Sequence, residues 1–201
     1  MRINVNEQEI DSHIQMPKLV LKHFVNPNKK LFYYDFTAKR IKRGTPASLN
    51  TEVGYYSKTV EHFMDVNIEN KLGDLLGIVD SSDFPDGKAL PWDYKEIVGS
   101  YVYALIARAP SLQAMMNKDK LFAQTLSAQD RHDIAAHDAW LLAQNAELLG
   151  EYEVSVLSNK TDEEWVLPTG GLISVGLKIF CPVSPTKAFK LQTRVSSKVE
   201  P

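Results

Sequence analysis

The spacing of apolar residues changes once along this chain, from a helical repeat to a repeat of two. Between residues 57 and 150, apolar side chains recur every three or four positions, as in amphipathic helices. After Gly150, residues Tyr152, Val154 and Val156 alternate with polar residues, as in half-buried strands. Helices grouped before strands predict an α+β fold: a central helical bundle with an N-terminal β-hairpin and a C-terminal antiparallel β-sheet.

The same patterns give approximate element boundaries. A short helix or extended segment is expected at 17–24, and a hairpin at 29–43. The helices are expected at 57–79, 94–108, 111–123 and 127–150, with 94–108 apolar nearly all round and therefore central. The strands are expected at 152–156, 164–167, 172–180 and 188–193, with the first two paired through a turn.

Length and cysteine content limit the class of protein. A chain of 201 residues suits one domain, residues 1–201, in which 1–13 and 195–201 are expected to be loose because they are polar. Cys181 is the only cysteine, which excludes an internal disulfide and favours a reducing compartment. Because no apolar run resembles a signal peptide or reaches about 18 residues, the sequence predicts a soluble, cytoplasmic protein that does not enter a membrane.

Positive charge is concentrated near the N-terminus. The whole chain has a net charge of −2, yet residues 17–43 contain eight cationic side chains and Asp35 as their only carboxylate. These cations are Lys18, Lys22, Lys29, Lys30, Lys39, Arg40, Lys42 and Arg43. Such asymmetry is typical of a basic face that meets an anionic partner.

The segment KKLFYYDFTAKRIKR, residues 29–43, admits two interpretations. Alternation places Phe32, Tyr34 and Phe36 on one face of a strand and Tyr33 on the other. In the first interpretation, aromatic rings stack on bases while cations follow the phosphates, as in single-strand binders. In the second, which the sequence favours, the three rings face the core and the lysines keep an exposed edge soluble. Tyr33 is then the ring most available to a ligand.

The segment HDIAAHD, residues 132–138, contains residue types that bind metals. Asp130, Asp133 and His137 share one face of the expected helix, and an Asp and a His one turn apart can bind a divalent ion. His132 is expected to point elsewhere. The same pattern fits a solvated polar face, which the sequence favours, so no metal site is predicted.

Three further features have a functional and a structural interpretation. Arg108 ends the apolar helix 94–108 and can hold a phosphate or carboxylate, or else pair with an acid such as Glu69. The TGG at 169–171 can present N–H groups to an anion or simply form a turn. Cys181 is expected to be a small core residue. Since neither GxxxxGK[ST] nor GxGxxG before a helix occurs, no nucleotide cofactor is expected.

Several segments in a fixed order resemble a bacterial and phage family catalogued as a domain of unknown function. The resemblance spans roughly 14–192. The segments are MPKLVLKHF followed by KKLFYYD, then FMDVNIENKL, YVYALIARAP, EEWVLPTGG and CPVSPTKAFKL. The resemblance implies a shared fold, a cytoplasmic location and a link to mobile elements, and so a role in conflict between host and invader. It implies no reaction.

The chain departs from the family pattern at two places. The family usually carries a histidine three residues before the opening proline, where this chain has Ile14 and His13 lies one residue further away. The family also usually carries SDNP after its tryptophan strand, where this chain has Thr169, Gly170 and Gly171. If that histidine and aspartate form an active site, this chain lacks it.

The sequence therefore predicts a binding protein. Its basic hairpin is expected to capture an anionic macromolecule, either nucleic acid or an acidic protein surface, through Lys29, Lys30, Tyr33, Lys39, Arg40, Lys42 and Arg43. A hydrolase or nuclease with Arg108, Asp133 and His137 as its catalytic residues is the alternative. A structural or toxin-neutralising partner with a large exposed apolar patch is a third possibility.

Overall fold

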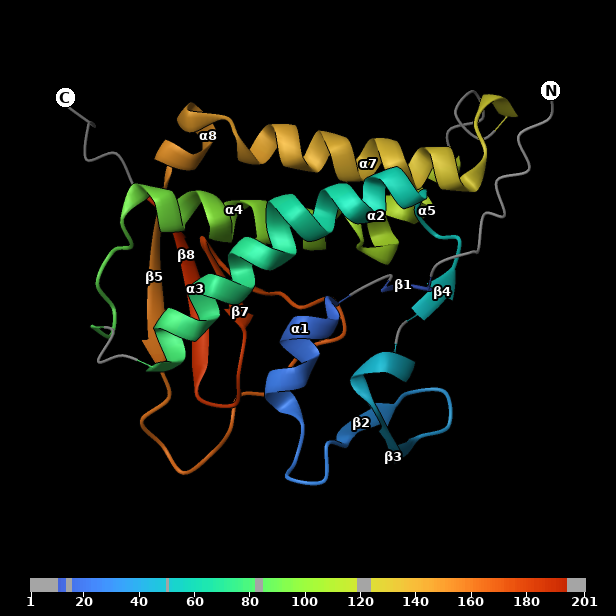
Figure 1. The fold of residues 1–201 in the computed structure, drawn as a ribbon. Coiled ribbons are helices and arrows are strands. Elements are labelled where there is room, and N and C mark those ends of the chain that lie inside the picture. The colour runs from blue at the N-terminus through green and yellow to red at the C-terminus, as the bar shows by residue number, and fades with distance from the viewer. Residues whose placement is uncertain (1–10, 14–15, 50, 82–84, 119–123, 195–201) are drawn as a thin grey trace.

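The computed structural model describes residues 11–13, 16–49, 51–81, 85–118 and 124–194. Its helices form a layer in which α7 packs along α4, with α2 and α3 beside them (Figure 1). The α-helices are α1 Lys18–Leu21, α2 Lys58–Met64, α3 Asn70–Ser81, α4 Trp92–Ala107, α5 Pro110–Lys118, α7 Ala128–Ala143 and α8 Ala146–Gly150. Short 3₁₀ turns follow α1 at Lys22–Phe24 and precede β4 at Pro46–Ser48.

Within the described residues, the strands form three antiparallel groups. β1 pairs with β4, β2 pairs with β3, and the C-terminal sheet has the order β5-β8-β7-β6. Their bounds are β1 Asp11–His13, β2 Leu31–Asp35, β3 Arg40–Gly44, β4 Thr51–Val53, β5 Tyr152–Ser158, β6 Ile173–Val175, β7 Lys178–Pro182 and β8 Lys187–Thr193. The β2–β3 hairpin lies beyond α1, at the opposite end of the molecule from α7 and α8 (Figure 1).

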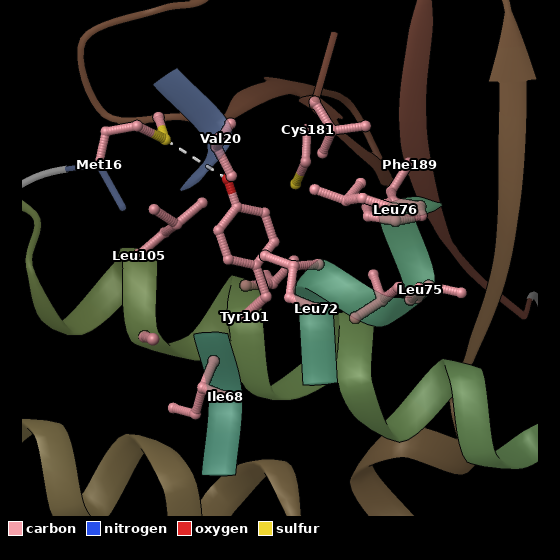
Figure 2. Packing of buried hydrophobic residues seen from close by; sticks show 14 of the residues in the cluster. Met16, Val20, Ile68, Leu72, Leu75, Leu76, Tyr101, Leu105, Cys181 and Phe189 are labelled. Carbon is pink, nitrogen blue, oxygen red and sulfur yellow. Dashed lines mark hydrogen bonds between the residues drawn. The ribbon is translucent and has the colours of Figure 1, made fainter. Parts of the chain in front are cut away.

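One apolar core joins the helices to the C-terminal sheet. Tyr101, at the middle of α4, is fully buried and donates a hydrogen bond to the sulfur of Met16 at 3.4 Å (Figure 2). Phe189 and Cys181 approach it from the sheet, and Leu76 from α3 (Figure 2). The expectation that 94–108 is the central buried helix is confirmed, and so is the α+β class with its hairpin and sheet at either end of the chain.

The helix expected at 57–79 is continuous but not uniform. Ser57 caps it, because its side chain accepts a hydrogen bond from the N–H of Val60. A π-helical segment, Asp65–Glu69, separates α2 from α3, and the N–H of Asn70 donates to the carbonyl of Asp65, five residues back. Such a segment inserts one extra residue into the helix and rotates α3 relative to α2. The repeat in the sequence does not reveal it.

Two other helix predictions need correction or fall partly outside the described residues. The helix expected at 127–150 breaks after Ala143, because the Asn145 side chain accepts hydrogen bonds from the N–H groups of Glu147 and Leu148 and so caps α8. The helix expected at 111–123 is α5 as far as Lys118; positions 119–123 lie outside the described residues. Of the segments expected to be loose, only 11–13 is described, and it forms β1.

The predicted pairing of the C-terminal strands is wrong in part. Segment 164–167 forms no strand; the N–H of Trp165 donates to the carbonyl of Pro185 in a loop. The partner of β5 is β8, in register from Tyr152 opposite Thr193 to Ser158 opposite Lys187. Segment 172–180 is a tight hairpin, β6 and β7, which turns at Gly176 with a φ of +59°.

Candidate functional site

The hairpin predicted from residues 29–43 is present in the expected register. Phe32 lies opposite Arg43, Tyr33 opposite Lys42, and Tyr34 opposite Ile41. Asp35 stabilises the turn, because its Oδ1 accepts a hydrogen bond from the N–H of Ala38 at 2.8 Å. This register assigns each side chain to one of two faces, which we call the inner face and the outer face.

The inner face attaches the hairpin to the core. Leu31 is buried there and belongs to the main apolar cluster. Tyr33 is half-buried over Gly44: a Cβ at that glycine would lie 3.4 Å from a ring carbon of Tyr33 and 3.5 Å from Leu49. The expectation that Tyr33 is the ring most available to a ligand is therefore wrong, since it lies on the protected side.

The outer face carries the exposed rings. Phe32, Tyr34 and Phe36 are 62%, 51% and 77% exposed, and Ile41, opposite Tyr34, is 70% exposed. The rings of Tyr34 and Phe36 pack edge to face with centroids 5.0 Å apart. The favoured interpretation, in which these three rings face the core, is wrong, because Leu31 and Tyr33 occupy the side that meets the protein. The outer face is an apolar surface turned toward solvent.

Cations surround this apolar surface. Arg43 lies on the outer face beside Phe32, and Lys39 and Arg40 are exposed at the turn end. Lys42 instead forms an ion pair with Asp35 at 2.5 Å, and this hydrogen bond lowers the pKa of the Asp35 carboxyl. Across the described ranges, no other cation of the hairpin forms an ion pair; these are Lys29, Lys30, Lys39, Arg40 and Arg43. Five of six charges therefore remain available to a partner.

Arg108 lies in the core and is paired there. The residue is 3% exposed, and its Nη2 donates to Glu69 Oε1 at 3.3 Å. The ring of Tyr56 lies 5.8 Å from its Cζ. Burial acts to lower the pKa of Arg108, but Tyr56 and Glu69 more than offset this and keep the guanidinium charged. The structural interpretation, a pairing with Glu69, is confirmed.

The acidic residues of α7 have structural partners. Asp130 accepts hydrogen bonds from the N–H and hydroxyl of Ser127 and completes the helix cap. Asp133 accepts from the N–H of Ser57 at 3.0 Å. The side chain of His137 is 58% exposed, and its Nδ1 lies 3.7 Å from Asp138 Oδ1. The structure therefore does not bring His137 to the buried Arg108, and no metal-type cluster of three His, Cys, Asp or Glu side chains occurs in the part of the chain described.

His132, which the sequence did not place on the face of Asp130, Asp133 and His137, turns inward. Its ring stacks on Tyr55 with centroids 3.7 Å apart, and its Nδ1 lies 3.1 Å from the Tyr55 carbonyl oxygen. Burial lowers the pKa of His132, and the backbone carbonyl and the nearby acids Glu52 and Asp133 only partly oppose this.

This environment predicts a pH dependence of stability. Because the pKa of His132 is lower in the folded protein, the unfolded chain takes up a proton first as pH falls below about 6.5. The free energy of unfolding should therefore rise between roughly pH 5.5 and pH 7.5. The variant His132→Phe keeps a ring against Tyr55 and should show a flatter dependence in urea denaturation. Equal slopes for the wild type and His132→Phe would contradict this account.

The remaining candidates have structural roles. Cys181 is buried, and burial raises the pKa of its thiol, so its reactive thiolate form is disfavoured. The TGG segment is a turn, as the structural interpretation expected, because the N–H of Gly171 donates to the carbonyl of Pro168 at 2.9 Å. Neither feature offers a free group to a ligand.

Comparison of the chain with protein-family models, with curated proteins and with solved structures found no match. None of the helices in the described ranges is both long enough and apolar enough to span a bilayer. The function of this chain is therefore inferred from its own geometry. Its most distinctive surface is the outer face of the hairpin, and the sequence contained the signal for it: rings at every second position place three aromatic side chains on one side.

Proposed function

We propose that this protein binds an anionic macromolecule in the cytoplasm through the outer face of its β2–β3 hairpin. The observation that carries the proposal is the set of exposed hairpin cations: Arg43 beside Phe32 on the outer face, and Lys39 and Arg40 at the turn end, none paired with a carboxylate in the described ranges. The rest of the molecule carries a net negative charge and repels a polyanion, whereas the hairpin attracts it.

The apolar character of the same surface supports the proposal. Aromatic rings and arginine are enriched where proteins bind partners, and exposed apolar patches mark such sites. The third possibility from the sequence, a structural or toxin-neutralising partner, was expected to carry an apolar patch in place of a basic one. Here exposed rings and unpaired cations occur on the same hairpin, so apolar contact adds affinity to electrostatic attraction.

The test is charge reversal at three exposed hairpin cations that form no ion pair in the described ranges. Lys39→Glu, Arg40→Glu and Arg43→Glu together should weaken binding at least tenfold, because phosphate or carboxylate contacts are lost. Lys42 is left unchanged, since it pairs with Asp35. Fluorescence anisotropy with labelled oligothymidylate, duplex DNA and polyglutamate measures the affinity for each class of polyanion.

The control matches the change in net charge. Lys71, Lys88 and Lys118 are exposed and lie outside the hairpin, so their reversal to glutamate should preserve affinity. Circular dichroism should show both triple variants folded. If both variants lose affinity equally, or if the hairpin variant binds as the wild type does, the hairpin is not the binding surface.

A further inference from the structure

We infer that the partner of the outer face is single-stranded nucleic acid, with Phe32, Tyr34 and Phe36 stacking on successive bases. This inference rests on the proposed function and specifies its ligand. The three rings come from alternate positions of β2 and the turn that follows it. Each ring keeps at least half of its surface accessible to solvent. DNA and RNA share the required chemistry, which is a row of flat bases joined by phosphates.

The spacing of the rings suits an extended strand. Phe32 and Tyr34 lie two positions apart on β2, where side chains on one face repeat about every 6.6 Å, and Phe36 follows in the turn. The rings of Tyr34 and Phe36 pack edge to face with centroids 5.0 Å apart, so each ring restricts the motion of the other. In a duplex, each base is covered by its neighbours, whereas an unpaired strand presents base faces to such rings. The row therefore fits about three unpaired bases.

The cations are placed to follow a backbone along that row. Lys29 and Lys30 precede β2 at one end, Lys39 and Arg40 lie at the other, and Arg43 lies beside Phe32 between them. A nucleic acid has one phosphate for each base. The phosphates of a strand stacked on the rings would therefore lie near the cations along the hairpin. This arrangement combines a stacking surface with a positively charged track.

The other possible occupants fit this surface less well. An acidic protein surface supplies carboxylates for the cations. Its charged side chains stay hydrated, however, so they would offer the three rings no apolar surface to pack against. A second copy of this chain would bring Arg43 and the turn cations against the same cations, which is unfavourable. Only a polyanion with exposed flat apolar faces satisfies both the rings and the charges.

The experiment separates stacking from electrostatics. Labelled oligothymidylate, oligouridylate, a DNA duplex of the same length and polyglutamate are titrated with the full chain at several salt concentrations. Wild-type protein should bind the single strands more tightly than the duplex and polyglutamate. Preference for the uridylate or the thymidylate strand identifies RNA or DNA as the source of the ligand.

Ring removal is the decisive variant. Stacking contributes about 1–3 kcal/mol per base, so Phe32→Ala, Tyr34→Ala and Phe36→Ala together should weaken single-strand binding by at least about 100-fold. Because no phosphate contact is lost, the dependence on salt should stay as in the wild type. Val166→Ala, Val175→Ala and Leu177→Ala remove three exposed apolar side chains elsewhere and should leave binding unchanged. Arg43→Gln should reduce the salt slope by about 0.7.

The outcomes distinguish this inference from the proposal it rests on. If ring removal leaves affinity unchanged while charge reversal abolishes binding, or if polyglutamate or duplex binds as tightly as the single strands, the hairpin is a general anion-binding surface and the inference fails alone. If no polyanion binds, both fail. Concentration-dependent self-association in sedimentation that disappears on ring removal would assign the face to a second copy and overturn the inference.

Discussion

Replacing Gly171 with alanine should lower the free energy of unfolding by about 3 kcal/mol. Gly171 has a φ of +74°, a region in which a Cβ atom clashes with its own backbone. A Cβ there would also lie 2.5 Å from Met16 Cε and 2.8 Å from Leu105 Cδ1. Both neighbours are buried beside Tyr101, so they can move only by disturbing a close-packed core.

The adjacent glycine provides the control for this result. A Cβ at Gly170 would meet no atom within 4 Å, so Gly170→Ala should be nearly neutral. Thermal unfolding followed by circular dichroism compares the two, and Gly171→Ala should melt roughly 10 °C below the wild type. Equal melting temperatures for the two variants would show that the turn lies differently against α4.

Removing the Glu69 side chain should lower the free energy of unfolding by about as much as Gly171→Ala, because it leaves the buried charge of Arg108 without its ion-pair partner. Arg108 is 3% exposed, and Glu69 is the carboxylate to which its Nη2 donates. Breaking a buried pair from one side typically costs about 3 kcal/mol, so Glu69→Ala should destabilise the fold by that amount. Urea denaturation of the variant measures it.

A double-mutant cycle identifies the cause. Arg108→Met removes the charge and keeps an unbranched apolar side chain in the core, so it should cost less than Glu69→Ala. When Arg108 is already methionine, Glu69→Ala should cause little further loss in the free energy of unfolding, because the core no longer contains a charge that needs a partner. If the two effects simply add, the destabilisation by Glu69→Ala comes from lost packing and not from the orphaned guanidinium.

The helical half of the fold could be predicted from the sequence because its signals are local. Ser57 and Ser127 cap their helices, and the apolar residues of 94–108 surround the helix that becomes the centre of the core. The β half depends on distant contacts. On alternation alone, strand β5 could pair with 164–167 or with β8. The structure pairs it with β8 and leaves Trp165 in a loop, a choice that local pattern does not determine.

The candidate site, like the fold, could be predicted only in part from the sequence. Alternation correctly placed Phe32, Tyr34 and Phe36 together, but it does not say which face of a two-stranded ribbon meets the protein. Both faces carry apolar side chains, and the choice is made by Leu31 entering the core and by Tyr33 covering Gly44. The ion pair between Lys42 and Asp35 follows from the register of the hairpin, which places both residues on the same face.

The openness of the outer face has an evolutionary consequence. Its side chains bury little, so folding places almost no demand on their identity, whereas Leu31 and Gly44 are constrained by their neighbours. Mutations at positions 32, 34, 36 and 41 can therefore accumulate without loss of the scaffold. A lineage could change the surface that this hairpin presents while it inherits the same core.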